Sequence, residues 1–150
     1  MPTIQIETPH SDDVLALLRQ GDEFALALYP VESYYGLDLE ALEADDAFLF
    51  VAREGGAALG TAAIVDRGDG SAEIKRMFVT DAARGLGIGH SLLDALETHA
   101  RISGISTLQL ETGLPQVAAI ALYEKHGYEQ IPRFGKYEDD PTSYCMQKHL

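Results

Sequence analysis

Hydrophobic and polar positions along the chain follow the two periods that distinguish strands from helices. Alternation with a period of two, or a short apolar run bounded by turn residues, predicts seven strands. The run Thr-Ile-Gln-Ile-Glu at residues 3–7 is the simplest case, and Leu108 and Leu110 alternate with Gln109 and Glu111 in the same way. The predicted strands cover residues 3–7, 47–53, 57–66, 73–79, 106–111, 128–132 and 143–148.

Helical periodicity, with start and stop signals, accounts for the segments between these strands. Ser11-Asp12-Asp13 is a helix start signal before an apolar run, and we expect that helix to end near Gly21. Ile88, Leu92, Leu93, Leu96 and Ala100 share one face of a longer helix. Further helices are predicted over residues 23–28, 39–42 and 116–125, with Gly127 ending the last.

A glycine-rich segment joins the strand at residues 73–79 to the long helix and reads Arg84-Gly85-Leu86-Gly87-Ile88-Gly89. Three glycines in five residues allow the backbone to approach a ligand closely. N–H groups at the start of a helix lack internal partners, so such a loop binds anions, most often phosphate. The segment is not a P-loop, because no Lys-Ser/Thr pair follows its last glycine, and its spacing is not that of a dinucleotide fingerprint.

Two motifs resemble those of the GCN5-related N-acetyltransferase (GNAT) family. Arg84-x-x-Gly87-x-Gly89 matches the pattern Arg/Gln-x-x-Gly-x-Gly/Ala of the family's coenzyme A loop. Residues 119–128, Ala-x-x-Leu-Tyr-Glu-Lys-x-Gly-Tyr, are similar to the family pattern Asn-x-x-Ala-x-x-Leu-Tyr-Glu-Lys-x-Gly-Phe. This chain departs from the second pattern by placing Gln116 at the asparagine position, which keeps the carboxamide on a side chain one methylene longer.

The resemblance implies one α/β (α+β) domain over residues 1–150, with a mixed, mostly antiparallel sheet of about seven strands. Helices would cover both faces, and two central strands, those of Val79 and Leu110, would splay apart to bind acetyl-CoA. The diphosphate would lie on the glycine loop and the pantetheine along the splayed strand. The implied cofactor-binding residues are Met77, Phe78, Val79, Arg84, Gly85, Leu86, Gly87, Ile88, Gly89, His90, Gln116 and Tyr123.

The activity that the resemblance implies is direct transfer of an acetyl group to a primary amine in a ternary complex. Tyr123 would protonate the departing thiolate, and Glu111 or Glu73, one on each splayed strand, would accept the proton of the amine, directly or through water. Alternatives are acetylation of a protein or peptide, and a non-catalytic acyl-CoA sensor. Expected acceptor contacts are Arg76, Tyr34, Tyr35, Arg133 and Tyr137, where an arginine would suit an amino-acid-like acceptor.

Composition limits the partners. The net charge of −13 argues against nucleic acid and anionic membranes, and an anionic cofactor must therefore rely on local donors such as Lys75, Arg76, Arg84 and His90. Cys145 is the only cysteine, so no internal disulfide and no cysteine-rich metal site exists, and we expect no metal and a buried thiol. The N-terminus lacks a basic segment and an apolar signal core, which predicts a cytoplasmic protein; a homodimer stays open.

Overall fold

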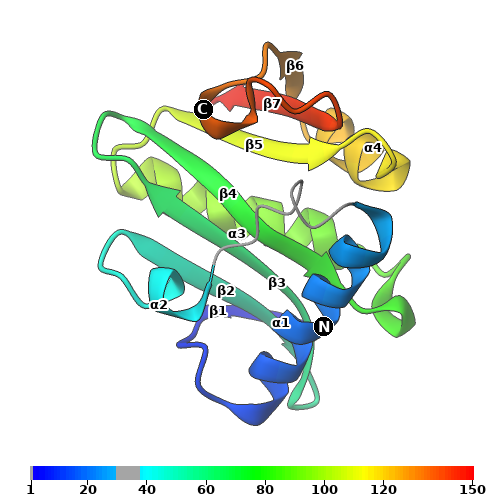
Figure 1. Ribbon diagram of the computed structural model, residues 1–150. Helices are drawn as coiled ribbons and strands as arrows, with labels where there is room; N and C mark the ends of the chain where they lie inside the picture. The colour runs from blue at the N-terminus through cyan, green and yellow to red at the C-terminus, as the bar shows by residue number, and fades with distance from the viewer. Residues whose placement is uncertain (1, 30–37) are drawn as a thin grey trace.

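Seven strands form a single sheet in the computed structural model, which describes residues 2–29 and 38–150 (Figure 1). The strand order is β1-β2-β3-β4-β5-β7-β6, and β4 with β5 is the parallel pair among otherwise antiparallel neighbours in these residues. The strands are β1 Thr3–Ile6, β2 Ala47–Glu54, β3 Ala57–Asp66, β4 Ser71–Val79, β5 Thr107–Gly113, β6 Glu129–Ile131 and β7 Ser143–His149. The expected mixed, mostly antiparallel sheet is confirmed, and each predicted strand end is correct to within two residues.

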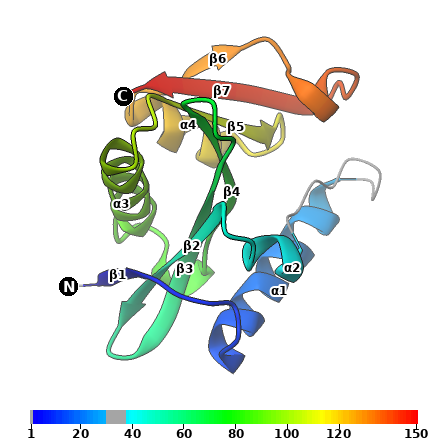
Figure 2. The ribbon, with the colours of Figure 1, turned by 90° about the vertical axis from the view of Figure 1, so that its left-hand side faces the viewer.

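Helices cover both faces of the sheet, as Figure 2 shows, with α3 on one side and α1 and α2 on the other. They are α1 Asp12–Leu28, α2 Leu39–Leu42, α3 Ile88–Ile102 and α4 Val117–Lys125. None of the helices in the described parts of the chain is long and apolar enough to cross a membrane.

The apolar run of β2 is buried on both faces because each face has its own helix layer. Phe50 and Ala52 belong to the core cluster that also holds the apolar face of α3. Leu49 and Val51 point the other way, into a second cluster with Val14 of α1. A strand buried on both faces has no polar alternate positions, which explains why this segment reads as a continuous hydrophobic run.

The first helix is longer than the sequence predicts, because α1 passes through Gly21 and continues to Leu28. A glycine inside a helix costs about 1 kcal/mol relative to alanine, and that cost suggested a helix end. In the structure, a Cβ at Gly21 would lie 3.5 Å from the ring of Phe78, so the glycine brings α1 close to β4. Tertiary packing therefore overrides the local preference, and the separate helix predicted over residues 23–28 is wrong.

A bulge in β4 changes which of its side chains face the helix layer. The register between β3 and β4 shifts between Thr61 and Ala63, and Arg76 adopts a left-handed backbone conformation with φ of 58°. The buried Thr61 hydroxyl donates to the carbonyl oxygen of Arg76 at 2.8 Å and so holds the bulge. The extra residue breaks the simple alternation of side chains along β4.

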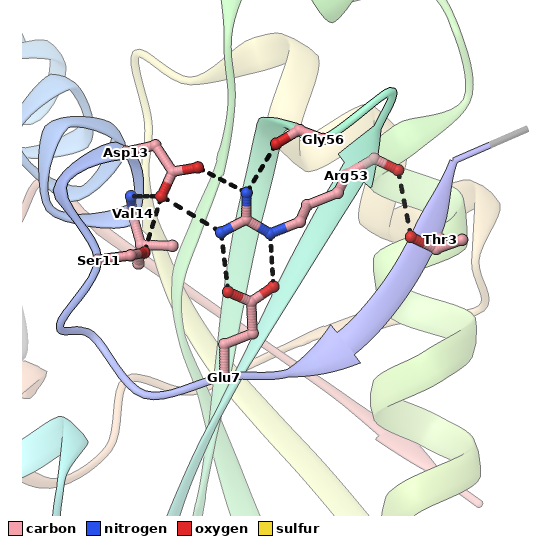
Figure 3. A network of polar contacts seen from close by, with 7 residues as sticks. All are labelled: Thr3, Glu7, Ser11, Asp13, Val14, Arg53 and Gly56. Carbon is pink, nitrogen blue, oxygen red and sulfur yellow. Dashed lines mark hydrogen bonds and ion pairs between the residues drawn. The ribbon is translucent and has the colours of Figure 1, made fainter.

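The start of α1 is fixed by Arg53 of β2, whose guanidinium donates five hydrogen bonds (Figure 3). Glu7, which follows β1, accepts two of them at 2.7 and 2.9 Å, and Asp13 of α1 accepts two at 2.6 and 3.2 Å. The fifth goes to the carbonyl oxygen of Gly56 in the β2–β3 turn. Arg53 therefore ties three segments together with every N–H that it has.

We expect Arg53→Lys to lower the free energy of unfolding by about 1 to 3 kcal/mol, because an ammonium group cannot reproduce a fork of five donors. Urea denaturation near pH 7 measures the change, and Arg19→Lys on the exposed face of α1 is the matched control. The Arg53 guanidinium, and then the Ser11 hydroxyl, hold the pKa of Asp13 well below its usual range.

A carboxylate with a lowered pKa stabilises the fold above its unfolded pKa, about 4, and this contribution is lost as the pH falls through its folded pKa. The difference in the free energy of unfolding between the wild type and Arg53→Lys should therefore become smaller as the pH falls from about 7 to about 3. A difference that stays constant over this pH range would contradict the stabilisation of ionised Asp13 by Arg53.

Candidate functional site

The hydrogen-bond ladder between β4 and β5 ends partway along both strands. Four pairs join them, from Ser71 with Thr107 to Ile74 with Leu110. Beyond this point β4 continues to Val79 and β5 to Gly113 without pairing to each other. The splay that the sequence predicts is therefore present, and the ends of both strands border an open wedge.

A cavity of about 860 Å³ fills this wedge and is walled by α1, β4, β5, α4 and the glycine loop. Eleven of the twelve expected cofactor-binding residues line it: Met77, Phe78, Val79, Arg84, Gly85, Gly87, Ile88, Gly89, His90, Gln116 and Tyr123. Leu86 is the twelfth, and its side chain is exposed. Residues that are spread from Met77 to Tyr123 in the sequence thus meet at one surface.

The glycines of the loop are needed for two different reasons. Gly85 and Gly87 adopt left-handed conformations with φ of 83° and 78°, which disfavour any side chain although space is open around them. Gly87 is also the N-cap of α3. Gly89 is required for space instead, since a Cβ there would lie 2.8 Å from Cδ2 of Leu122 on α4. The loop therefore presents bare backbone at the start of a helix, the arrangement that binds a phosphate group.

Glu111 of β5 lies in the cavity wall and is mostly buried. The hydroxyl of Ser143 on β7 donates to its Oε2 at 2.8 Å. Burial raises the pKa of Glu111 to about 7, against a smaller lowering effect of the Ser143 bond. A carboxyl group with this pKa exchanges protons near neutral pH, as a general base requires.

Glu73 of β4, the other candidate base, is held by three side chains instead. Tyr137 donates to its Oε2 at 2.6 Å, Arg67 donates to Oε1 at 3.2 Å, and the ammonium of Lys75 lies 3.7 Å away. Glu73 is not among the residues that line the cavity. These three partners hold the carboxyl group in a fixed position, which is a structural arrangement.

Tyr123 of α4 lines the cavity although only 4% of its surface is exposed to solvent. Its ring meets the ring of Tyr128 edge to face, with centroids 5.9 Å apart. Burial, and then the charge of Glu111, raise the pKa of the Tyr123 phenol well above its usual value near 10. The phenol is therefore protonated at neutral pH and faces the same cavity as Glu111.

The residues expected to contact the acceptor are placed differently from one another. Arg76 lines the cavity, but its guanidinium donates to Asp22 and to the carbonyl oxygen of Leu18, both on α1. Arg133 donates to the carbonyl oxygen of Asp140 at 2.6 Å, and Tyr137 is buried. Tyr34 and Tyr35 lie outside the described residues.

Tyr29, the C-cap of α1, is a cavity residue that the sequence analysis does not find. Its hydroxyl accepts a hydrogen bond from Nε2 of Gln116 at 2.9 Å, across 87 positions of sequence. Its ring lies directly against β5, because a Cβ at Gly113 would lie 1.8 Å from the Tyr29 hydroxyl oxygen. No local pattern marks a tyrosine at a helix end as a cleft residue, so only the tertiary contact reveals it.

Comparisons with known proteins agree with this geometry. The model of the acetyltransferase (GNAT) family matches residues 14–128. An "IAA acetyltransferase" of Azospirillum brasilense is 44% identical, and the match spans 100% of both chains. A solved structure from Klebsiella pneumoniae, named as an acyl-CoA N-acyltransferase, is 35% identical, with a TM-score of 0.84 over 100% of this chain and 98% of that one.

The fold is also shared with a protein that was solved with acetyl-CoA bound. This GNAT family acetyltransferase of Elizabethkingia anophelis is 19% identical and superimposes with a TM-score of 0.74, over 99% of this chain and 98% of that one. At this identity the similarity concerns the fold.

The contact between Tyr29 and β5 can be tested by a double substitution. We expect Gly113→Ala to lower the free energy of unfolding by about 1 to 2 kcal/mol, because the added methyl group displaces the Tyr29 ring and breaks its bond to Gln116. In a Tyr29→Ala background the same change should cost almost nothing. Chemical denaturation of the four proteins measures the coupling, and an equal cost in both backgrounds would refute the contact.

Proposed function

The chain belongs to the acetyltransferase (GNAT) family and is an acyltransferase, and we propose that it transfers an acetyl group from acetyl-CoA to the primary amine of a small molecule. The transfer is direct, within a ternary complex of enzyme, acetyl-CoA and amine. The observation that carries the proposal is that Glu111, with its pKa raised to about 7, and the protonated Tyr123 face one cavity. These two groups provide the base and the acid that such a transfer needs.

The chain's backbone and basic side chains bind the cofactor in this proposal. N–H groups of residues 85–90 donate to the diphosphate, and β4 beyond Ile74 offers main-chain groups to the pantetheine amides. Bound acetyl-CoA supplies a thioester, whose carbonyl carbon is open to attack by an amine. Binding amine and thioester in one cavity accounts for much of the rate by placement alone.

Glu111 removes the proton that makes the amine unreactive. A lysine-like amine has a pKa of about 10.4 and arrives protonated at neutral pH. Burial raises the pKa of Glu111 to about 7, which brings it closer to that of the amine than the usual 4.3 or so. The Ser143 hydroxyl holds the carboxylate while it accepts this proton, directly or through one water.

Tyr123 returns a proton to the sulfur when the C–S bond breaks. Burial raises the pKa of the phenol, which keeps the proton on its oxygen until a thiolate forms beside it. The Tyr128 ring fixes the Tyr123 ring in place. Two protons leave the ammonium nitrogen in all. The first goes to Glu111 before the attack and from there to solvent; the second leaves the nitrogen as the amide forms and restores the phenol of Tyr123, which has given its own proton to the sulfur.

Acceptor class is tested by thiol release from acetyl-CoA with a panel of small amines, peptides and IAA, the last because of the name of the Azospirillum relative. Release with small amines supports the proposal. Release with peptides alone would indicate a protein acetyltransferase instead. Binding of acetyl-CoA without release for any member of the panel would contradict an enzymatic role.

Glu111→Gln should lower kcat/KM by about 100-fold or more, since the amide cannot accept a proton. In the wild type, kcat/KM should rise as the pH increases through about 7, because the base works in its deprotonated form. Initial rates between pH 6 and about 9 measure both effects. Glu73→Gln is the matched control, a strand glutamate outside the cavity wall that should keep the rise near pH 7.

Tyr123→Phe should lower kcat by about 100-fold and leave the Kd of acetyl-CoA unchanged, because the ring stays and only the acidic proton is lost. Stopped assays of turnover and calorimetry of acetyl-CoA binding separate the two quantities. Tyr144→Phe on β7 is the matched control, with turnover close to that of the wild type. Normal turnover of Tyr123→Phe would remove this tyrosine from the chemistry.

A further inference from the structure

Two histidines from different helices meet beside the glycine loop. His90, in the first turn of α3, lines the cavity, and His126 is the C-cap of α4. Their Nδ1 atoms lie 3.2 Å apart, within hydrogen-bond distance, and their ring centroids are separated by 5.4 Å. The pair connects the loop to α4, which also carries Tyr123.

The outer nitrogen of His126 is directed at two carboxylates. Nε2 of His126 lies 3.0 Å from Oδ1 of Asp94 and 3.5 Å from Oε2 of Glu97. Glu97 is 3% exposed and is itself fixed, because Lys148 and Tyr128 donate to it at 2.7 and 3.0 Å. Since an ionised carboxylate only accepts hydrogen bonds, these contacts favour the tautomer of His126 that carries its proton on Nε2.

A count of protons on the two rings follows from these contacts. One proton lies on Nε2 of His126, and one lies between the two Nδ1 atoms. A pair that holds only these two protons is neutral, and Nε2 of His90 is then bare. A phosphate oxygen beside Nε2 of His90 accepts a hydrogen bond only if that nitrogen gains a third proton, which makes the pair cationic.

We propose that the His90–His126 pair takes up one proton when the diphosphate of acyl-CoA binds, and that His126 is the positioning residue that fixes the proton count. The inference rests on the proposed cofactor seat at residues 85–90. Asp94 and His126 assign the outer proton and so leave only Nε2 of His90 to respond to the ligand. The positive charge gained lies close to two phosphate groups in a protein whose net charge is −13.

Fixed charges around the pair come close to cancelling. The charged and titratable side chains that contact the pair or its partners are Asp94, Glu97, Arg101, Tyr128 and Lys148, and Arg84 lines the same cavity as His90. Arg84 is engaged by Asp81 at 3.0 Å, and Glu97 has Lys148 at 2.7 Å and Arg101 at 3.7 Å. A proton on the histidine pair is therefore the charge that can change at this end of the cavity.

Calorimetric titration with acetyl-CoA, in HEPES and in Tris, tests the proposal through the dependence of the observed heat on the buffer. The titration is done at a pH of about 8, above most of the range in which histidine usually changes its charge, where the phosphate monoester of the ligand, with a pKa near 6, is ionised. The wild type should take up protons on binding, with a stoichiometry of up to one per acetyl-CoA. Its Kd should rise by up to about tenfold per pH unit above that pH.

His90→Gln and His126→Gln should each abolish the proton uptake and weaken binding, while losing the dependence of Kd on pH. His10→Gln, in the connection between β1 and α1 where His10 lies 3.2 Å from Glu43, is the matched control and should keep the uptake. Circular dichroism verifies folding. Because His90 is exposed, its variant gives a reading even if His126→Gln fails to fold.

Binding of acetyl-CoA to the wild type without proton uptake would overturn the inference and leave the proposed function intact. Uptake that persists in His90→Gln would also overturn it, because the proton would then belong to another group. Absence of any acetyl-CoA binding by the wild type would instead refute the proposed function itself.

Discussion

The end of the ladder between β4 and β5, at Ile74 and Leu110, is the feature on which the site depends. A strand that loses a neighbour normally exposes its backbone groups, but each strand here keeps its outer partner. β4 remains paired to β3 as far as Val79 with Gly60, and β5 remains paired to β7 as far as Gly113 with Ser143. The wedge is therefore open although both of its strands stay paired, and they belong to the two antiparallel halves of the one sheet.

Arginines of this acidic chain are used to hold the helix that closes the wedge. Arg53 holds the start of α1 through Asp13, and Arg76 holds its middle through Asp22 and the carbonyl oxygen of Leu18. The bulge at Arg76 is what directs that side chain toward α1. A helix fixed at two points by charge-assisted bonds presents Tyr29 to β5 in one position, which keeps one wall of the cavity constant.

Local patterns predict the parts of the site that lie on one continuous segment. The glycine loop and Tyr123 are predicted from motifs, because the residues that form a phosphate site or an amphipathic helix lie close together in the sequence. Tyr29 and His126 do not, since their partners lie 87 and 36 positions away and no spacing rule connects them. The continuity of α1 through Gly21 was mispredicted for the same reason, because the ring of Phe78 decides it.

Their surroundings distinguish the two strand glutamates, both of which the sequence leaves as candidate bases. Glu73 has the cations of Arg67 and Lys75 and the hydroxyl of Tyr137 around it, so its charge is compensated where it lies. Glu111 is mostly buried and accepts a hydrogen bond from the neutral hydroxyl of Ser143, and burial is the main influence on the pKa of Glu111. Burial also lowers the pKa of Lys75, against the pull of Glu73. The carboxylate of Glu73, which is paired with cations, holds neighbouring side chains in place. The carboxyl group of Glu111, which burial removes from water, binds a proton more readily, and it is this group that faces the cavity.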